Sequence, residues 1–365
     1  MNAARLRRAA AAVALLAAQA RAAVPGAKAK QELAAATRSY QRLDLLRALD
    51  GFNAAMKAFP GWKTGAGYRA ECRWALGEQD GARKDAELAA TLQPNDARSR
   101  AARGKARLIL RDYAGALADF RAAAQADPKL VDAPLGEGSA LSAQGDLRGS
   151  LQALDAAAAL DADSAATLLL RGSVKSRLGD FRGASDDYAA LLAVNPKYAW
   201  AHYHRGKALR DLKDFPGADK ELTAFLDAVP DHEDAAYLRS NVRFLIGDYQ
   251  GAADDLTKVI SLDPRNGLAY SNRGLARAKL GDRDGAVADL RKALELDPAH
   301  RDKIQSAIDA LTGAPAAPAP APVPTPAPTA SDAPPQAAPR VRAAQADKPA
   351  PPERRTGQEE SQYIQ

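Results

Sequence analysis

Residues 267–300 read GLAYSNRGLARAKLGDRDGAVADLRKALELDPAH, a 34-residue stretch in which proline stands third from the end. Proline recurs upstream at the same interval of 34 residues. The residues in this register are Pro60, Pro94, Pro128, Ala162 in place of a proline, Pro196, Pro230, Pro264 and Pro298. Counting back from them divides the chain, without an insertion, into units 1 to 8 at 29–62, 63–96, 97–130, 131–164, 165–198, 199–232, 233–266 and 267–300. A fixed period of this length indicates a repeat architecture.

Within each unit, small residues stand at positions 8 and 20, and a bulky residue stands at position 24 in every unit except unit 2, which has Ala86. Between the small positions lies Gly-Asp or a relative, as in Gly247-Asp248 and Gly281-Asp282. Glycine accepts the left-handed backbone that ends a helix, and aspartate can cap the next helix. Proline at position 32 stops that second helix. We therefore predict two helices per unit, in close contact at positions 8 and 20, with position 24 filling the space beside them.

One helix pair cannot bury its apolar face alone, so the units are expected to stack. Aromatic residues make up only 5% of the chain, which favours close-packed helices over a β-sandwich. The eight units at 29–300, and unit 8 above all, resemble the tetratricopeptide repeat. The resemblance implies an all-α fold, a right-handed α-solenoid superhelix of eight helix-turn-helix repeats with a C-terminal capping helix at 301–312.

Position 7 is arginine in six units, and position 23 is acidic in the same six. The pairs are Arg69 with Asp85, Arg103 with Asp119, Arg171 with Asp187, Arg205 with Glu221, Arg239 with Asp255, and Arg273 with Asp289. Units 1 and 4 lack both members. This matched presence predicts an ion pair between the two helices of a unit, and an exposed pair of this kind would contribute only about 0–1 kcal/mol.

The two ends of the chain differ from the repeats. Residues 1–22 combine three early arginines, a short apolar stretch and small-x-small motifs, which predicts a secretory signal peptide and a periplasmic or secreted protein. A short linker at 23–28 follows. Residues 313–365 are rich in proline and alanine, which predicts a disordered tail that begins as an extended spacer. The apolar run near the N-terminus is too short to span a bilayer.

Charge and motifs exclude several function classes. The formal net charge of +6 falls to +2 once the four arginines of residues 1–22 are set aside, and no basic stripe remains for nucleic acid. No phosphate loop, GxSxG or HExxH motif is present. His202 and His204, two residues apart on a helix, do not face the same way. The lone Cys72 stands where most other units carry a small apolar residue. We therefore predict a non-enzyme without metal or cofactor.

The resemblance implies that the first helix of each unit lines a concave groove, through positions 2, 5, 6, 9, 12 and 13. The densest aromatic and basic set at these positions lies in units 6 and 7, and such residues are enriched at binding hot spots. It consists of Trp200, Tyr203, His204, Lys207, Arg210, Tyr237, Asn241 and Phe244. Several of these aromatics could instead pack between units. Asn241 and Asn272 match the two asparagines with which some family members hold a peptide carboxylate, but Tyr237 stands in place of the lysine.

These observations predict an exported scaffold or adaptor that binds a partner protein or an extended peptide in its concave groove. An alternative from another class is an accessory component of envelope polysaccharide export or assembly, in which groove aromatics would stack on sugars. The oligomeric state and the identity of the partner stay open.

Overall fold

A computed structural model describes residues 27–58 and 62–313, and every structural statement below refers to these ranges. They form seventeen α-helices and one short 3-10 helix, without a strand. The all-α prediction is therefore confirmed. The predicted signal at 1–22 and the proline-rich part of the tail lie outside the described residues.

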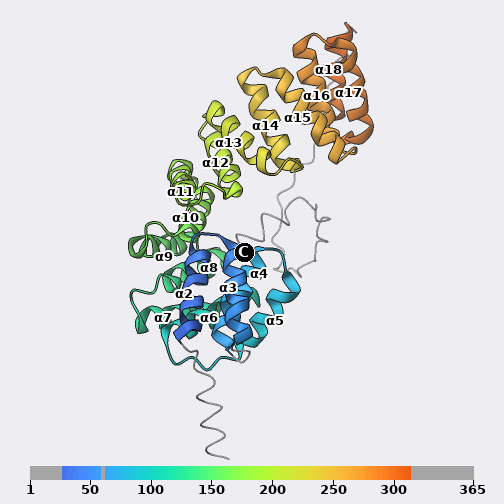
Figure 1. Ribbon diagram of the computed structural model, residues 1–365. Coiled ribbons are helices and arrows are strands. Elements are labelled where there is room, and N and C mark those ends of the chain that lie inside the picture. The colour runs from blue at the N-terminus through green and yellow to red at the C-terminus, as the bar shows by residue number, and fades with distance from the viewer. Residues whose placement is uncertain (1–26, 59–61, 314–365) are drawn as a thin grey trace, which may run out of the picture.

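Each unit contributes two antiparallel helices, which Figure 1 shows as a continuous stack. The pairs are α2 (Ala27–Gln41) with α3 (Leu45–Ala58), α4 (Lys63–Ala75) with α5 (Gln79–Ala90), α6 (Ala97–Ile109) with α7 (Tyr113–Ala126), α8 (Asp132–Ala143) with α9 (Leu147–Leu160), α10 (Ala165–Arg177) with α11 (Phe181–Val194), α12 (Ala199–Asp211) with α13 (Phe215–Ala228), α14 (Glu233–Ile246) with α15 (Tyr249–Leu262), and α16 (Gly267–Leu280) with α17 (Arg283–Leu296). A 3-10 turn (Pro298–His300) leads to α18 (Arg301–Thr312), whose Ile304 and Ile308 are buried against α17.

The turn inside a unit follows the predicted chemistry. In unit 7, Gly247 has φ +86° and ends α14. Asp248 then caps α15, because its Oδ1 accepts the N–H of Gly251 at 2.9 Å. Position 8 must be small in unit 6 because a Cβ added to Gly206 would lie 2.9 Å from Cγ of Leu222, the residue at position 24. Small residues at position 8 thus let the two helices pack through the bulky residue at position 24.

The units stack along a curve. Consecutive helices contact one another throughout the described chain, and the first helices α4, α6, α8, α10 and α12 also contact each other directly. These first helices therefore lie toward the inner side of the curve. The curvature of the N-terminal units is strong enough to bring α2 into contact with α10 (Figure 1). None of the described helices is both long and apolar enough to cross a bilayer.

All six predicted arginine–acid pairs are present. The shortest nitrogen–oxygen distance in each pair is 2.6–2.7 Å. The acid is never exposed, since the six acidic residues keep only 3–7% of their surface accessible. The six pairs are therefore buried ion pairs and not weak, solvent-exposed salt bridges.

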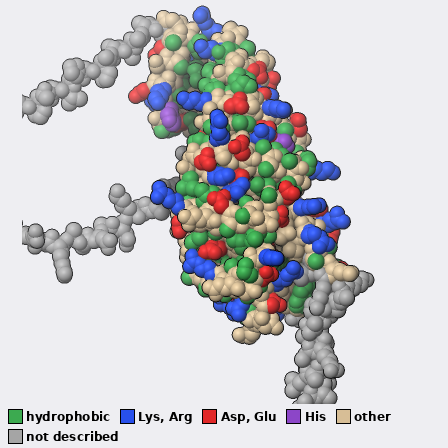
Figure 2. Space-filling view, turned by 90° about the vertical axis from the view of Figure 1, so that its left-hand side faces the viewer, with side chains coloured by type: hydrophobic (Ala, Val, Ile, Leu, Met, Phe, Trp, Pro, Cys, Tyr) green, Lys and Arg blue, Asp and Glu red, His purple; other side chains and the backbone are tan. Residues whose placement is uncertain are grey.

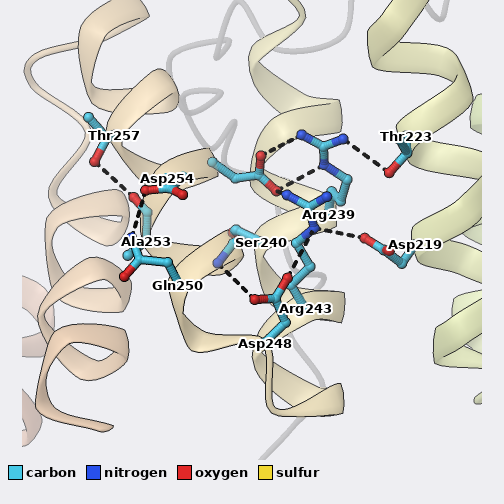
Figure 3. Close-up of polar contacts among 12 residues, drawn as sticks. Asp219, Thr223, Arg239, Ser240, Arg243, Asp248, Gln250, Ala253, Asp254 and Thr257 are labelled. Carbon is cyan, nitrogen blue, oxygen red and sulfur yellow. Dashed lines mark hydrogen bonds and ion pairs between the residues drawn. The ribbon is translucent and has the colours of Figure 1, made fainter. Parts of the chain in front are cut away.

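Five of the six arginines, all except Arg205, also reach backward along the stack. In units 2, 5, 7 and 8 the remaining Nη1 of the arginine donates to a polar side chain at position 25 of the preceding unit. In unit 7, Arg239 Nη1 donates to Thr223 Oγ1 at 3.1 Å (Figure 3). The Nε and Nη2 atoms of Arg239 donate to Asp255. The pair therefore fixes the two helices of a unit and ties that unit to its neighbour.

A second cation at position 11, which the sequence analysis missed, contacts the same carboxylate in five units. These residues are Arg73, Arg107, Lys175, Arg243 and Arg277, at 2.7–3.1 Å from the acid. Unit 6 has Leu209 at this position, and His202 Nδ1 instead lies 2.6 Å from Glu221 Oε2. His202 thus belongs to the structural network of unit 6.

Candidate peptide-binding groove

An apolar pocket opens between α14 and α16, the first helices of units 7 and 8. Its lining consists of Ser240, Asn241, Phe244, Leu245, Leu256, Asn272 and Leu275. Leu245 and Leu275 are 60% and 40% exposed. We call these seven residues the unit 7–8 pocket. Pockets with an apolar wall and a few polar groups are typical of binding sites.

Two amide side chains stand at the polar side of the unit 7–8 pocket. Asn272 Nδ2 donates to Asn241 Oδ1 at 3.2 Å and to Tyr237 Oη at 3.0 Å. Burial raises the pKa of Tyr237, so its phenol stays neutral. The Asn241 side chain also hydrogen-bonds the Tyr237 hydroxyl, and among the described residues Asn272 Oδ1 accepts no hydrogen bond. An amide nitrogen carries two donor hydrogens, so one N–H of Asn241 remains. One donor and one acceptor are therefore left for a ligand.

The predicted aromatics of unit 6 form a packed cluster instead of an open surface. Tyr203 and His204 are 4% and 8% exposed. The Tyr203 ring lies 5.1 Å from Phe225 and 5.4 Å from His232, and the His204 ring stacks 5.5 Å from Tyr188. Such ring pairs stabilise packing beyond the area they bury. These ring contacts therefore join unit 5 to unit 6 and hold the two helices of unit 6 together.

The other predicted residues of unit 6 are partly accessible. Trp200 packs on Phe225, at 5.2 Å between ring centroids. Lys207 Nζ lies 5.2 Å from the centroid of the Tyr203 ring. Arg210 pairs with its neighbour Asp211 at 2.7 Å. The structure thus packs Trp200, Tyr203 and His204 into an aromatic cluster of unit 6 and leaves Lys207 and Arg210 partly accessible. Asn241 and Phe244 lie apart from them in the unit 7–8 pocket.

Within unit 7, the structure brings three of the predicted residues together. Asn241 and Phe244 line the pocket, and Tyr237 is hydrogen-bonded at its edge. The Phe244 ring also meets Tyr249 edge-on at 5.2 Å. Leu245 and Leu275 stand at positions 13 and 9, which the resemblance places in the groove, but the prediction favoured aromatic and basic residues and omitted them.

A second cavity lies on the inner side of units 1 to 5, and its polar end was also missed. Lys105 is 1% exposed and its Nζ lies 2.6 Å from Glu71 and 3.5 Å from Asp132. The rings of Tyr40 and Tyr68 lie 5.0 and 5.4 Å from the same ammonium. The sequence feature that could have predicted this ion pair is the glutamate and the lysine at position 9 of two adjacent units.

Burial and charge act together on the groups in this cavity. Burial disfavours the Lys105 ammonium, but Glu71 and Asp132 more than offset this and raise its pKa above the usual value. Burial, and then the Asp132 carboxylate, raises the pKa of Tyr68. Burial likewise raises the pKa of the Cys72 thiol, which is fully enclosed. Lys105 is therefore a charged and buried structural group, and Cys72 has no nucleophilic character.

Charged side chains of both signs are mixed with apolar ones on the face of the stack that Figure 2 shows. On the face in Figure 2, acidic and basic side chains alternate, and neither sign gathers into one broad field. The described surface in this view offers apolar patches between the charges rather than a single electrostatic stripe.

Comparison with known sequences identifies the repeats. Profiles of the tetratricopeptide repeat match residues 169–233, 206–266 and 267–300. None of the curated proteins is detectably similar in sequence to this chain.

Solved structures share the helix-pair stack. A tetramer of Cut9 and Hcn1 from the anaphase-promoting complex matches with a TM-score of 0.55 and 15% identity, over 76% of this chain and 54% of that chain. YrrB, described as a tetratricopeptide repeat protein with an unusual peptide-binding site, matches with a TM-score of 0.49 and 21% identity, over 52% of this chain and 96% of its own. MamA matches with a TM-score of 0.43 and 26% identity, over 44% of this chain and 95% of its own. The chain therefore contains tetratricopeptide repeats, which family profiles identify over residues 169–300.

Proposed function

We propose that this protein is a non-enzymatic interaction scaffold that binds an extended peptide segment of a partner protein along the first helices of units 6 to 8. Tetratricopeptide repeats support a role in protein–protein interaction. The proposed location of the peptide rests on the amide pair of Asn241 and Asn272, because this pair leaves one donor and one acceptor beside an apolar pocket.

The unit 7–8 pocket fits the chemistry of an extended peptide. Such a segment presents an N–H and a C=O on each residue, so the amide pair can hold one peptide group whatever its side chain. Phe244, Leu245 and Leu275 then offer an apolar wall for one neighbouring side chain. Lys207 and Arg210 of unit 6 remain predicted contacts for an acidic group on the same segment.

We also propose that the chain is exported and acts in the periplasm or outside the cell, with residues 1–22 as the cleaved signal. The basic start, apolar stretch and small-x-small motifs support this. Mass spectrometry of the mature N-terminus tests it, because a protein recovered from the producing cell with residues 1–22 intact would contradict export.

The polysaccharide alternative has less support than the peptide hypothesis. Stacking on a sugar needs an exposed ring face, and Tyr203 and His204 are buried among other aromatics. A glycan array separates the two ideas, because a peptide scaffold should bind no glycan.

A displayed random-peptide library, selected on the full chain, provides the direct test. Selected peptides should bind Asn241→Ala and Asn272→Ala variants at least about tenfold more weakly, which corresponds to about 1.4 kcal/mol. Lys292→Ala, an exposed change on the second helix of unit 8, should leave binding unchanged. If peptides bound all three variants as tightly as the unchanged protein, the groove would lie elsewhere.

A further inference from the structure

The turn between α2 and α3 contacts a part of the chain far away in sequence. Leu43 packs within its own unit, and also against the two buried clusters that contain Leu135 of α8 and Leu169 of α10. One residue earlier, the Arg42 carbonyl accepts a hydrogen bond from Asn195 Nδ2 at 2.9 Å, across 153 positions of sequence. The N-terminal turn therefore occupies the inner side of units 4 and 5.

Leu43 stands at a position where the repeat favours glycine. It is position 15, which has a left-handed backbone in all eight units, and Leu43 itself has φ +58°. Glycine fills this position in five units, at Gly77, Gly145, Gly179, Gly247 and Gly281. Arg111 and Lys213, the other exceptions, are exposed at this position, whereas Leu43 is partly buried. The conformational strain of a leucine at this position is offset by the contacts of its side chain with α8 and α10.

Asn195 also departs from its equivalents in the other units. Position 31 is aspartate in units 3, 4, 7 and 8, and in three of them the carboxylate accepts the backbone N–H two residues later, at 2.9–3.1 Å. Asn195 Oδ1 makes the same bond to Lys197 N–H at 3.2 Å. Its amide nitrogen supplies the additional donor to Arg42. An aspartate here would keep the local turn and lose that donor.

The cavity beneath the turn is a complete small site. Its apolar wall includes Leu135, Ala166, Leu169 and Leu170 from first helices, and Leu43 faces them. At its other end, Tyr40 of the N-terminal unit covers Lys105, which Glu71 and Asp132 neutralise. The N-terminal unit thus supplies both an apolar and an aromatic group to the groove of units 2 to 5.

We propose that the inner surface of units 3 to 5 is a second docking site, separate from the unit 7–8 pocket, and that the chain's own turn 41–44 occupies it as a tethered ligand. The site recognises a leucine on a tight turn, together with the preceding backbone carbonyl, which Asn195 binds. A partner that presents such a turn enters this site only when turn 41–44 leaves it.

The test uses the full chain with Asn195→Asp, which installs the residue that four other units carry at this position. Its matched control is Asp263→Asn, the opposite exchange at position 31 of unit 7. Leu43→Lys is a second variant, since Lys213 shows that lysine is accepted at position 15. In Asn195→Asp and Leu43→Lys, amide hydrogen exchange should accelerate about tenfold or more in α2 and α10 and stay unchanged in α14–α17. Asp263→Asn should leave α2 and α10 unaffected. Unchanged exchange in both altered chains would overturn the proposal.

A fluorescent peptide of residues 36–49, added in trans, then tests docking. It should bind Leu43→Lys at least about tenfold more tightly than the unchanged chain, because the tethered competitor is weakened while the site keeps the Asn195 amide. The same peptide carrying lysine in place of Leu43 should not bind. If hydrogen exchange accelerates but the peptide does not bind, the contacts of turn 41–44 only stabilise the fold, and the proposed docking site is overturned. An increase in molar mass on light scattering of Asn195→Asp would overturn the assignment of the turn to its own chain.

Discussion

Arg239 and Asp255 form a two-point ion pair between the two helices of unit 7, with Nε–Oδ2 and Nη2–Oδ1 distances of 2.9 and 2.6 Å. Arg243 holds the same carboxylate at 3.1 Å and also reaches Asp219 of unit 6 at 2.9 Å. The carboxylate is buried, so this network differs from an ordinary surface bridge. It connects helix packing inside a unit to packing between units.

The Arg239–Asp255 pair is expected to be energetically coupled. Arg239→Ala should destabilise the chain by roughly 1–3 kcal/mol, because Asp255 stays buried with only Arg243 as a charged partner. Asp255→Ala should cost a similar amount, and the double variant should lose less than the sum of the two. Chemical denaturation followed by circular dichroism measures all three. Additive losses would show that the two side chains do not interact.

The left-handed position 15 is expected to show a glycine preference. Lys213→Gly should stabilise the chain by up to about 1 kcal/mol, because Lys213 has φ +64° and its side chain is exposed. Gly247→Lys, the reverse change in unit 7, should destabilise by a similar amount, although no atom lies near the added Cβ. Thermal midpoints of both variants test this. Equal midpoints would mean that local turn conformation does not limit stability.

Stability is expected to fall at alkaline pH. In the folded chain, burial raises the pKa of Tyr40 and of Tyr68 above the usual value of 10.0. Glu71 and Asp132 raise the pKa of Lys105 above its usual value of 10.5. Their stabilisation is complete below these usual values and is lost as the pH rises toward the folded pKa values. Each group then contributes a slope of about 1.4 kcal/mol per pH unit.

Tyr40→Phe isolates one of these groups. Its stability should decline less steeply above a pH of about 10 than that of the unchanged chain, since one titrating phenol is gone. Urea denaturation between neutral and alkaline pH provides the two curves. Parallel curves for the two proteins would show that Tyr40 does not titrate differently on folding.

Cys72 is expected to be inert in the folded protein. Its side chain is fully buried, and burial raises its pKa, so neither access nor thiolate is available to an alkylating reagent. Labelling with iodoacetamide at pH 8 should proceed only under unfolding conditions. Rapid labelling of the native chain would show that units 1 and 2 open readily.

The Gly-Asp turns and the arginine–acid pairs could be predicted from the sequence, because these interactions join residues of the same unit. Arg239 and Asp255 are 16 positions apart, and the repeat places both on facing helix surfaces. The candidate site was harder to predict. Position 5 or 6 of a unit faces the inner side, but the exposure of Tyr203 and His204 depends on the rings of Tyr188, Phe225 and His232 in neighbouring elements.

By itself the sequence determined the period, the helix pairs and the contacts within a unit, because short-range spacing and turn chemistry fix them. Only the tertiary structure decided which groove side chains are accessible, and only it brought the Arg42–Leu43 turn to Asn195, 153 positions away. The physical reason is that the curve of a solenoid is the sum of small rotations between successive units. Those rotations arise from side-chain packing between neighbours, which a repeat pattern does not encode.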